Sequence, residues 1–227
     1  VSARAADKTK TKARIVIAGA GAAGLTTASR LAASLDGAKI TLIDARKEHL
    51  YQPGFTLVGA GIKPVGYVTS TTAEYLPEGV ELVQERVAEF DPQGNRVVTD
   101  SGASYPYDFL VVATGMVLEY SLIEGMDEKL IGQNGIGSIY HSPAGAQATW
   151  QAMSAFADKG GRGVFTRPST EMKCAGAPLK YTFVPEDYLT RHGQRSKAEV
   201  VYNSNNKVLF SVPIVSEKVR MLFQERG

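Results

Sequence analysis

Gly19-Ala20-Gly21-Ala22-Ala23-Gly24, with the spacing Gly-x-Gly-x-x-Gly, is the segment from which the architecture of this chain can be worked out. It follows residues 14–18 (Arg-Ile-Val-Ile-Ala), whose unbroken apolar character is typical of a strand buried on both faces of a parallel sheet. Residues 25–35 have helical spacing, and residues 39–43 have the composition of a second strand. The sequence therefore predicts a βαβ unit of about 30 residues.

The glycine-rich turn has the residue types needed to hold a dinucleotide. Gly19 permits a tight turn, Gly21 lets the backbone approach a pyrophosphate, and Gly24 allows the helix and the strand to pack closely. The backbone N–H groups of Ala22 and Ala23 lie at the expected helix N-terminus, where negative charge is favoured. A glycine turn in a protein without a nucleotide is the alternative.

The residues after this unit indicate FAD rather than NAD. Asp44, 20 residues after Gly24, can accept a hydrogen bond from a ribose 2′-OH and would repel a 2′-phosphate. A loop containing Gln52 and an antiparallel meander, with its first strand at residues 80–90, come before the next apolar strand, residues 109–113. We expect that last strand to be buried on both faces. This order is typical of flavoproteins with two dinucleotide-binding domains.

The second half of the chain predicts an unfinished domain of the same kind. A helix is expected at residues 143–157, a strand at 163–166, a helix at 177–191 and a strand at 199–203, with one more helix near 215–225. The fold class is α/β: a FAD/NAD(P)-binding Rossmann-like parallel sheet with an antiparallel meander, plus an incomplete second Rossmann-like domain. The expected divisions are a flexible leader (1–13), an FAD-binding domain (14–118), a linker and helix (119–160) and a partial second domain (161–227).

Composition excludes several classes of protein. The 227 residues are 44% hydrophobic and 21% charged with a net charge of +2, which is typical of a globular protein and gives no reason to expect a nucleic-acid partner. A single cysteine excludes an intramolecular disulfide, and no apolar run reaches the roughly 18 residues of a membrane span. The three histidines have no metal-binding spacing, so no metal is expected.

The only cysteine, Cys174, lies between an expected strand and an expected helix. A helix N-terminus and the neighbouring Lys173 and Lys180 would favour the nucleophilic thiolate. The alternative is a buried cysteine that packs as a small apolar group.

Three motifs together resemble sulfide:quinone oxidoreductase, in the branch that includes the mitochondrial enzyme and its proteobacterial relatives. They are residues 51–61 (Tyr-Gln-Pro-Gly-Phe-Thr-Leu-Val-Gly-Ala-Gly), residues 113–115 (Ala-Thr-Gly) and residues 173–180 (Lys-Cys-Ala-Gly-Ala-Pro-Leu-Lys). The resemblance implies that FAD lies across the glycine-rich turn and Asp44. The further cofactor-binding residues that it implies are Gln52, Val87, Thr114 and Gly115.

The resemblance also implies the chemistry. Cys174 would be one of two redox cysteines: sulfide attacks a cysteine disulfide or trisulfide, giving a persulfide and a thiolate, and the thiolate reduces FAD. Electrons pass to a membrane quinone, and sulfane sulfur passes to an acceptor. Lys180 would stabilise thiolate or persulfide charge, with a solvated helix lysine as the alternative. The protein would be peripheral to a bacterial membrane, on its periplasmic side, or alternatively to the mitochondrial inner membrane, and homo-oligomerisation is left open.

The chain also departs from the family's pattern. It has no second cysteine and none of the later segments that hold FAD and contact the membrane, so we expect an N-terminal half whose remainder is elsewhere or in a partner chain. A degenerate protein without turnover is the alternative to such a fragment. The turn that begins at Arg167-Pro168 has no glycine fingerprint, which indicates lost nicotinamide binding. Two rival functions remain, a flavocytochrome-type sulfide dehydrogenase and a non-catalytic flavin-binding fragment.

Overall fold

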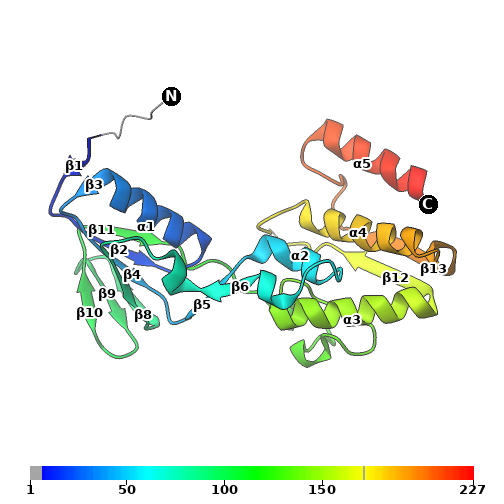
Figure 1. Cartoon of the computed structure of the whole chain (residues 1–227), viewed down its shortest axis with the longest axis horizontal. Coiled ribbons are helices and arrows are strands. Elements are labelled where there is room, and N and C mark those ends of the chain that lie inside the picture. Colours follow the sequence, from blue (N-terminus) through cyan, green and yellow to red (C-terminus); the bar gives the residue numbers. More distant parts are fainter. Residues whose placement is uncertain (1–6, 171) are drawn as a thin grey trace. The chain divides into compact units, whose positions relative to one another are not determined.

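The computed structural model describes residues 7–170 and 172–227, which form two compact units (Figure 1). The first unit consists of the described residues up to Tyr51 together with Thr69–Leu118, and the second consists of Gln52–Val68 together with Glu119–Gly227. The residues 52–68 therefore group with the second unit, whereas the expected domain 14–118 includes them.

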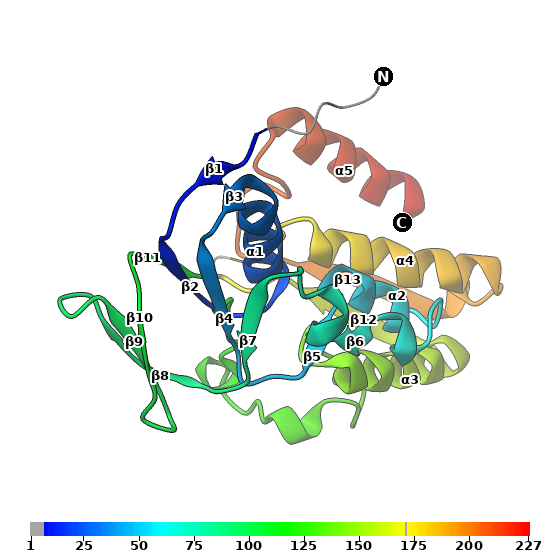
Figure 2. The ribbon, with the colours of Figure 1, turned by 60° about the vertical axis from the view of Figure 1, so that its left-hand side comes forward.

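A four-stranded parallel sheet is the centre of the first unit. Its order is β11 (Phe109–Val112), β2 (Arg14–Ala18), β4 (Lys39–Ile43) and β7 (Val80–Val83), and Figure 2 shows these strands side by side. Helix α1 (Ala22–Ser34) connects β2 to β4 and buries Leu25 and Ala28 against Ile17 and other residues of one face of the sheet. The predicted βαβ unit and parallel sheet are confirmed.

An antiparallel meander packs against the other face of this sheet. It contains β8 (Val87–Asp91), β9 (Arg96–Thr99) and β10 (Ser104–Pro106), and Val97 and Tyr107 pack with Val16 and Ile43 of the parallel sheet. The meander itself was predicted, but the single strand expected at residues 80–90 is wrong. Val80 and the residues after it pair in parallel with β4, so the polar stretch 84–86 separates two strands that belong to different sheets.

Strand β11 also differs from the expectation, because it is not buried on both faces. Phe109 and Val112 are 63% and 59% exposed. Within the described residues β11 pairs only with β2, so it is an edge strand.

The leader is only partly outside the fold. Residues 1–6 of the expected leader lie outside the described residues, but β1 (Thr9–Lys10) pairs in parallel with β3 (Leu35–Asp36). Thr11 N donates a hydrogen bond to Asp36 O at 2.9 Å. These contacts correct the expectation of a flexible segment through residue 13. A second short pair, β5 (Glu48–Leu50) with β6 (Thr69–Thr71), is antiparallel.

The second unit contains a complete βαβ unit. Strand β12 (Gly161–Thr166), helix α4 (Ala177–Arg191) and strand β13 (Ala198–Asn203) follow one another, and β12 and β13 pair in parallel. The strand, helix and strand expected at residues 163–166, 177–191 and 199–203 are therefore confirmed, and their sheet has two strands within the described part of the chain. Helix α3 (Pro143–Lys159) and helix α4 pack together in one hydrophobic cluster, which contains Met153 of α3, Leu189 of α4 and Ala198 of β13.

Two further elements complete this unit. Helix α5 (Pro213–Arg226) stacks Phe223 on Phe183 of α4, with ring centroids 4.9 Å apart. The short helix α2 (Phe55–Val58) packs against α3, and Gly61 lies so close to Trp150 that a Cβ atom there would be 2.3 Å from the indole ring. That contact explains why residues 52–68 group with the second unit. Among the described helices none is long and apolar enough to cross a bilayer.

Candidate functional site

The glycine-rich turn of the first unit is closed by backbone contacts that only glycine permits. Gly19 has a φ of +104°, and a Cβ atom on it would lie 2.3 Å from the carbonyl oxygen of Ala113. A Cβ atom on Gly24 would lie 1.8 Å from the carbonyl oxygen of Gly19. Both positions therefore require glycine, one for the turn and one for the approach of α1 to the turn.

The same turn is open where a phosphate would approach. Apart from Gly21 itself and its two chain neighbours, no heavy atom among the described residues lies within 4 Å of a Cβ atom built on Gly21. Gly21 is the N-cap of α1, no described side chain caps this helix, and its first turn has no acidic residue. Ala22 and Ala23 are exposed, so the N-terminal N–H groups are accessible to an anion. This geometry fits the pyrophosphate of a dinucleotide.

Asp44 lies directly after β4 and is joined to the glycine-rich turn. Its Oδ2 accepts a hydrogen bond from Ala20 N at 2.8 Å, and its Oδ1 accepts one from Arg46 N at 2.9 Å. The side chain is only 10% exposed, and this burial by itself would raise the pKa of Asp44. The hydrogen bonds from Arg46 and Ala20 and the charge of Arg46 have a larger combined effect, so the pKa of Asp44 lies below its ordinary value. The carboxylate stays ionised and can accept a hydrogen bond from a ribose hydroxyl.

The end of β11 lies beside the turn. Ala113 N donates to Ala18 O at 2.8 Å, and Thr114 Cα is 3.1 Å from the Cβ position of Gly19. Thr114 and Gly115 are both exposed, and Gly115 has a φ of +79°. The structure thus brings these two residues to the carboxyl end of the parallel sheet, where the glycine-rich turn also lies.

Two residues of the first unit have contacts that the sequence did not indicate: Val87, which was assigned to the cofactor site, and Arg46, which was not assigned to any site. Val87 lies in β8, and its side chain packs against the cluster of Val16 and Ile43. Arg46 was missed, although its spacing of two residues from Asp44 is a signal for an ion pair; the shortest separation of their charged atoms is 3.3 Å.

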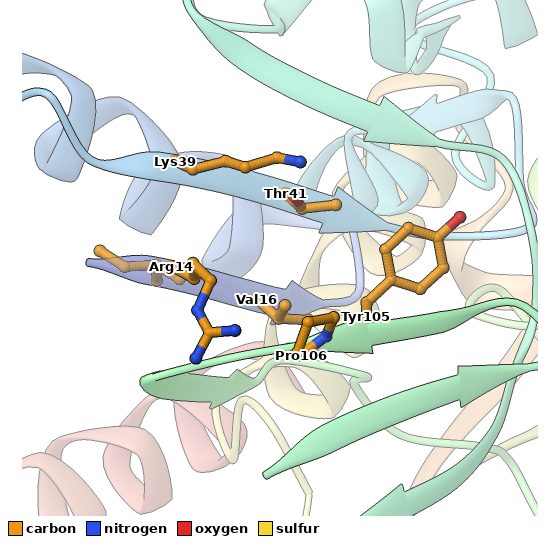
Figure 3. A pocket seen from close by; sticks show the side chains of 7 residues that line it. Arg14, Val16, Lys39, Thr41, Tyr105 and Pro106 are labelled. Atoms are coloured by element: carbon orange, nitrogen blue, oxygen red, sulfur yellow. The ribbon is translucent and has the colours of Figure 1, made fainter. Parts of the chain in front are cut away.

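A hollow at the amino ends of the strands, opposite to the end where the glycine-rich turn lies, does not belong to this site (Figure 3). Arg14 and Lys39, the first residues of β2 and β4, line it together with Tyr105 of β10. The glycine-rich turn instead follows the last residue of β2. Arg14 is paired with Asp108 at 2.7 Å, and this contact lowers the pKa of Asp108 to about 2. The hollow therefore belongs to a structural ion pair.

Cys174 of the second unit is exposed, which overturns the alternative of a buried, packed cysteine. It precedes α4 by three residues, and its carbonyl oxygen accepts a hydrogen bond from Ala177 N at 3.1 Å. Gly176, not Cys174, is the N-cap of α4. The thiol therefore belongs to the loop before the helix, which differs from the expected position at the helix N-terminus.

The two lysines near Cys174 differ in their contacts. Lys173 donates a hydrogen bond from Nζ to Oε1 of Gln52, at the start of the segment 52–68. Lys180 is exposed on the first turn of α4. The sequence assigned Gln52 to the cofactor site and did not foresee its contact with Lys173.

Tyr140 is a neighbour of Cys174 that no sequence signal identified. Burial, and then the negative charge of an ionised Cys174, raise the pKa of the Tyr140 phenol. Its ring is stacked with that of the buried Phe55, with centroids 6.2 Å apart and an interplanar angle of 23°. In the described part of the chain no group of histidine, cysteine and acidic residues could hold a metal ion.

Comparisons with known proteins agree with this arrangement. Residues 13–147 match the family model "Pyridine nucleotide-disulphide oxidoreductase". The chain is 35% identical to the mitochondrial sulfide:quinone oxidoreductase of Mus musculus, over 93% of this chain and 46% of that protein. It is 36% identical to the corresponding protein of Dictyostelium discoideum, over 97% of this chain and 48% of that protein.

A solved structure, the sulfide:quinone oxidoreductase of Aquifex aeolicus, has the same fold. Its TM-score is 0.77 at 24% identity, over 94% of this chain and 49% of that one. The chain thus spans about half the length of the curated relatives it matches. The resemblance to sulfide:quinone oxidoreductase and the FAD/NAD-binding Rossmann-like fold are confirmed, and both support FAD as the cofactor. The chain belongs to the pyridine nucleotide-disulphide oxidoreductase family.

Proposed function

We propose that this chain is the part of an FAD-dependent enzyme that oxidises sulfide and passes the electrons to a membrane quinone. The observation that carries the proposal is the exposure of Cys174, in a chain whose relatives are named sulfide:quinone oxidoreductases. The printed names of those relatives favour a quinone over a cytochrome as the electron acceptor.

The first unit has the groups needed to bind FAD. The turn at Gly21 and the start of α1 fit the pyrophosphate, Asp44 fits a ribose hydroxyl, and Thr114 and Gly115 lie at the same edge of the sheet. Val87 is the further contact that we propose in this unit, and Gln52, which belongs to the second unit, is the other residue that the resemblance assigns to the cofactor. FAD, when bound, supplies a two-electron acceptor that passes electrons to the quinone.

Cys174 holds the sulfur during the reaction. Attack of hydrosulfide on a disulfide between Cys174 and a second cysteine forms one S–S bond and breaks another. The products are a persulfide on one cysteine and a thiolate on the other, so atoms and charge balance. Because this chain has one cysteine, the second comes from outside the sequence described, from a C-terminal half or a partner chain. The persulfide sulfur then passes to an acceptor.

The remaining parts of the proposal concern the whole protein. Lys180, exposed beside the cysteine loop, contributes positive charge to the thiolate or persulfide. Attachment to the membrane is peripheral, at a bacterial membrane or at the mitochondrial inner membrane.

The test is sulfide-dependent quinone reduction by the FAD-loaded protein together with its C-terminal half. Cys174→Ser should abolish this activity and leave FAD binding unchanged, since the substitution alters none of the groups proposed to hold FAD. Quinone reduction at the wild-type rate in Cys174→Ser would remove Cys174 from the mechanism. Reduction of a cytochrome but not of a quinone would favour a flavocytochrome-type enzyme.

A further inference from the structure

Lys173 connects the cysteine loop to the segment 52–68 within the second unit. Its ammonium group donates a hydrogen bond to the side-chain carbonyl of Gln52. Gln52 is itself fixed, because it begins a short 3-10 helix that leads directly into the buried Phe55, which is 1% exposed. The residue that precedes Cys174 is therefore held by a rigid part of the unit.

A second contact holds the chain on the other side of Cys174. The buried phenol of Tyr181, in α4, donates a hydrogen bond to the carbonyl oxygen of Gly59 at 2.6 Å. Lys173 and Tyr181 thus join the two sides of the cysteine loop to residues 52–59. This double attachment limits where the ammonium group of Lys173 can lie relative to Cys174.

The partner of Lys173 leaves its charge in place. The side chain of Gln52 is a neutral amide, so the hydrogen bond orients the ammonium group without cancelling its charge. The ion pairs formed among residues 7–170 and 172–227 do not include Lys173. The residue that precedes an exposed thiol therefore carries a positive charge that is held in place by a neutral partner.

We propose that Lys173, held by Gln52, is a positioning residue that makes Cys174 favour anionic over neutral sulfur reactants. The attraction brings a negatively charged reactant to the thiol through the field of the ammonium group. The identification of this reactant as hydrosulfide, HS⁻, rests on the proposed function. The preference for anions does not depend on it.

The experiment compares two alkylating reagents that differ in charge. Iodoacetate is an anion and iodoacetamide is neutral, and with each of them the Cys174 thiolate displaces iodide. Because Cys174 is the only cysteine, the rate of thiol loss reports this site alone. The ratio of the two rate constants cancels the thiolate fraction and the exposure of the thiol, so it measures the local charge.

Removing the charge should lower this ratio. Lys173→Gln should lower the iodoacetate-to-iodoacetamide ratio about two- to fivefold, as expected for one charge roughly 4–8 Å away in water. Lys173→Arg should keep the ratio within about twofold of the wild type, because it retains the charge. In about 1 M salt the wild type and Lys173→Gln should give the same ratio, because the charge is screened within about 3 Å.

Two further variants separate the positioning role from a structural one. Gln52→Glu places a carboxylate on the ammonium group and should lower the ratio as Lys173→Gln does, whereas Lys180→Gln should lower it less. Equal changes in both rate constants, with the ratio unchanged, would show a merely structural role and overturn the proposal. A larger fall for Lys180→Gln than for Lys173→Gln would also overturn it. Sulfide oxidation at the wild-type rate by Cys174→Ser would defeat the proposed function. It would leave the alkylation ratios measured on the proteins that retain Cys174 unchanged, so the two failures can be told apart.

Discussion

Replacing Gly24 by alanine should destabilise the first unit through one backbone clash. The added Cβ atom would lie 1.8 Å from the carbonyl oxygen of Gly19 and 2.9 Å from its carbonyl carbon. An ordinary carbon–oxygen contact is about 3.3 Å or longer, so α1 must move by more than about 1 Å away from the turn. No side-chain rotation can relieve the clash, because both partner atoms belong to the backbone.

The size of the effect follows from two opposing contributions. Overpacking in a close-packed region costs about 1–3 kcal/mol, and this clash is at the severe end of that range or beyond it. Alanine is a better helix former than glycine by about 1 kcal/mol, which offsets part of the cost because Gly24 lies within α1. We therefore expect the free energy of unfolding to fall by about 2 kcal/mol, a large share of the 5–15 kcal/mol of a typical domain.

Urea unfolding followed by circular dichroism measures this change, and amide hydrogen exchange of β2 and β4 assigns it to the first unit. Gly66→Ala is the matched control, because its Cβ atom meets no described atom within 4 Å and its stability should change by less than about 0.5 kcal/mol. Gly21→Ala is equally free of contacts and should keep the fold, yet its methyl group should weaken FAD binding by about tenfold or more. If Gly24→Ala unfolded at the same urea concentration as Gly66→Ala, the backbone clash would not have the predicted cost, and the reasoning would be refuted.

Three further changes test other parts of the structure. Tyr181→Phe removes the hydrogen bond to the Gly59 carbonyl and should lower the free energy of unfolding by about 1–2 kcal/mol, measured in urea; an unchanged midpoint would contradict the contact. The folded-state pKa of Asp108, about 2, lies below its unfolded value near 3.9, so its contribution to stability is present above about pH 4 and is lost as pH falls towards 2. An NMR titration of Asp108 should show this midpoint and a return towards the ordinary value in Arg14→Met; the same low midpoint in both proteins would exclude the ion pair as the cause. Asp44→Ala should weaken FAD binding by about tenfold, measured by flavin fluorescence, and equal affinity would remove Asp44 from the site.

Much of the fold follows from local patterns in the sequence. The apolar residues of β2 and β4 and the glycine-rich turn between them predict the first βαβ unit, and helix α4 has the bounds that its spacing predicts. These elements were predictable because hydrophobic periodicity and glycine spacing act over a few residues. Strands β7 and β8 were not separated, because the sheet to which each strand belongs depends on distant partners.

The candidate site likewise has features that follow from a local motif and features that depend on contacts between distant residues. The open approach at Gly21 was expected from the motif alone, whereas the contact of Lys173 with Gln52 joins residues that are 121 positions apart. No local pattern reports such a pair. Tyr140 was missed for the same reason, since only the packing of the second unit brings it into the field of Cys174.

Anaerobic mixing of sulfide with the FAD-loaded protein tests the central claim most directly, because it isolates the reduction of the flavin from later electron transfer. The visible absorbance of the flavin should be lost in the wild-type protein combined with its C-terminal half. It should persist in Cys174→Ser carrying the same amount of FAD. Equal bleaching of both proteins, after subtraction of the reaction of free FAD with sulfide, would contradict a role for Cys174 in sulfide oxidation.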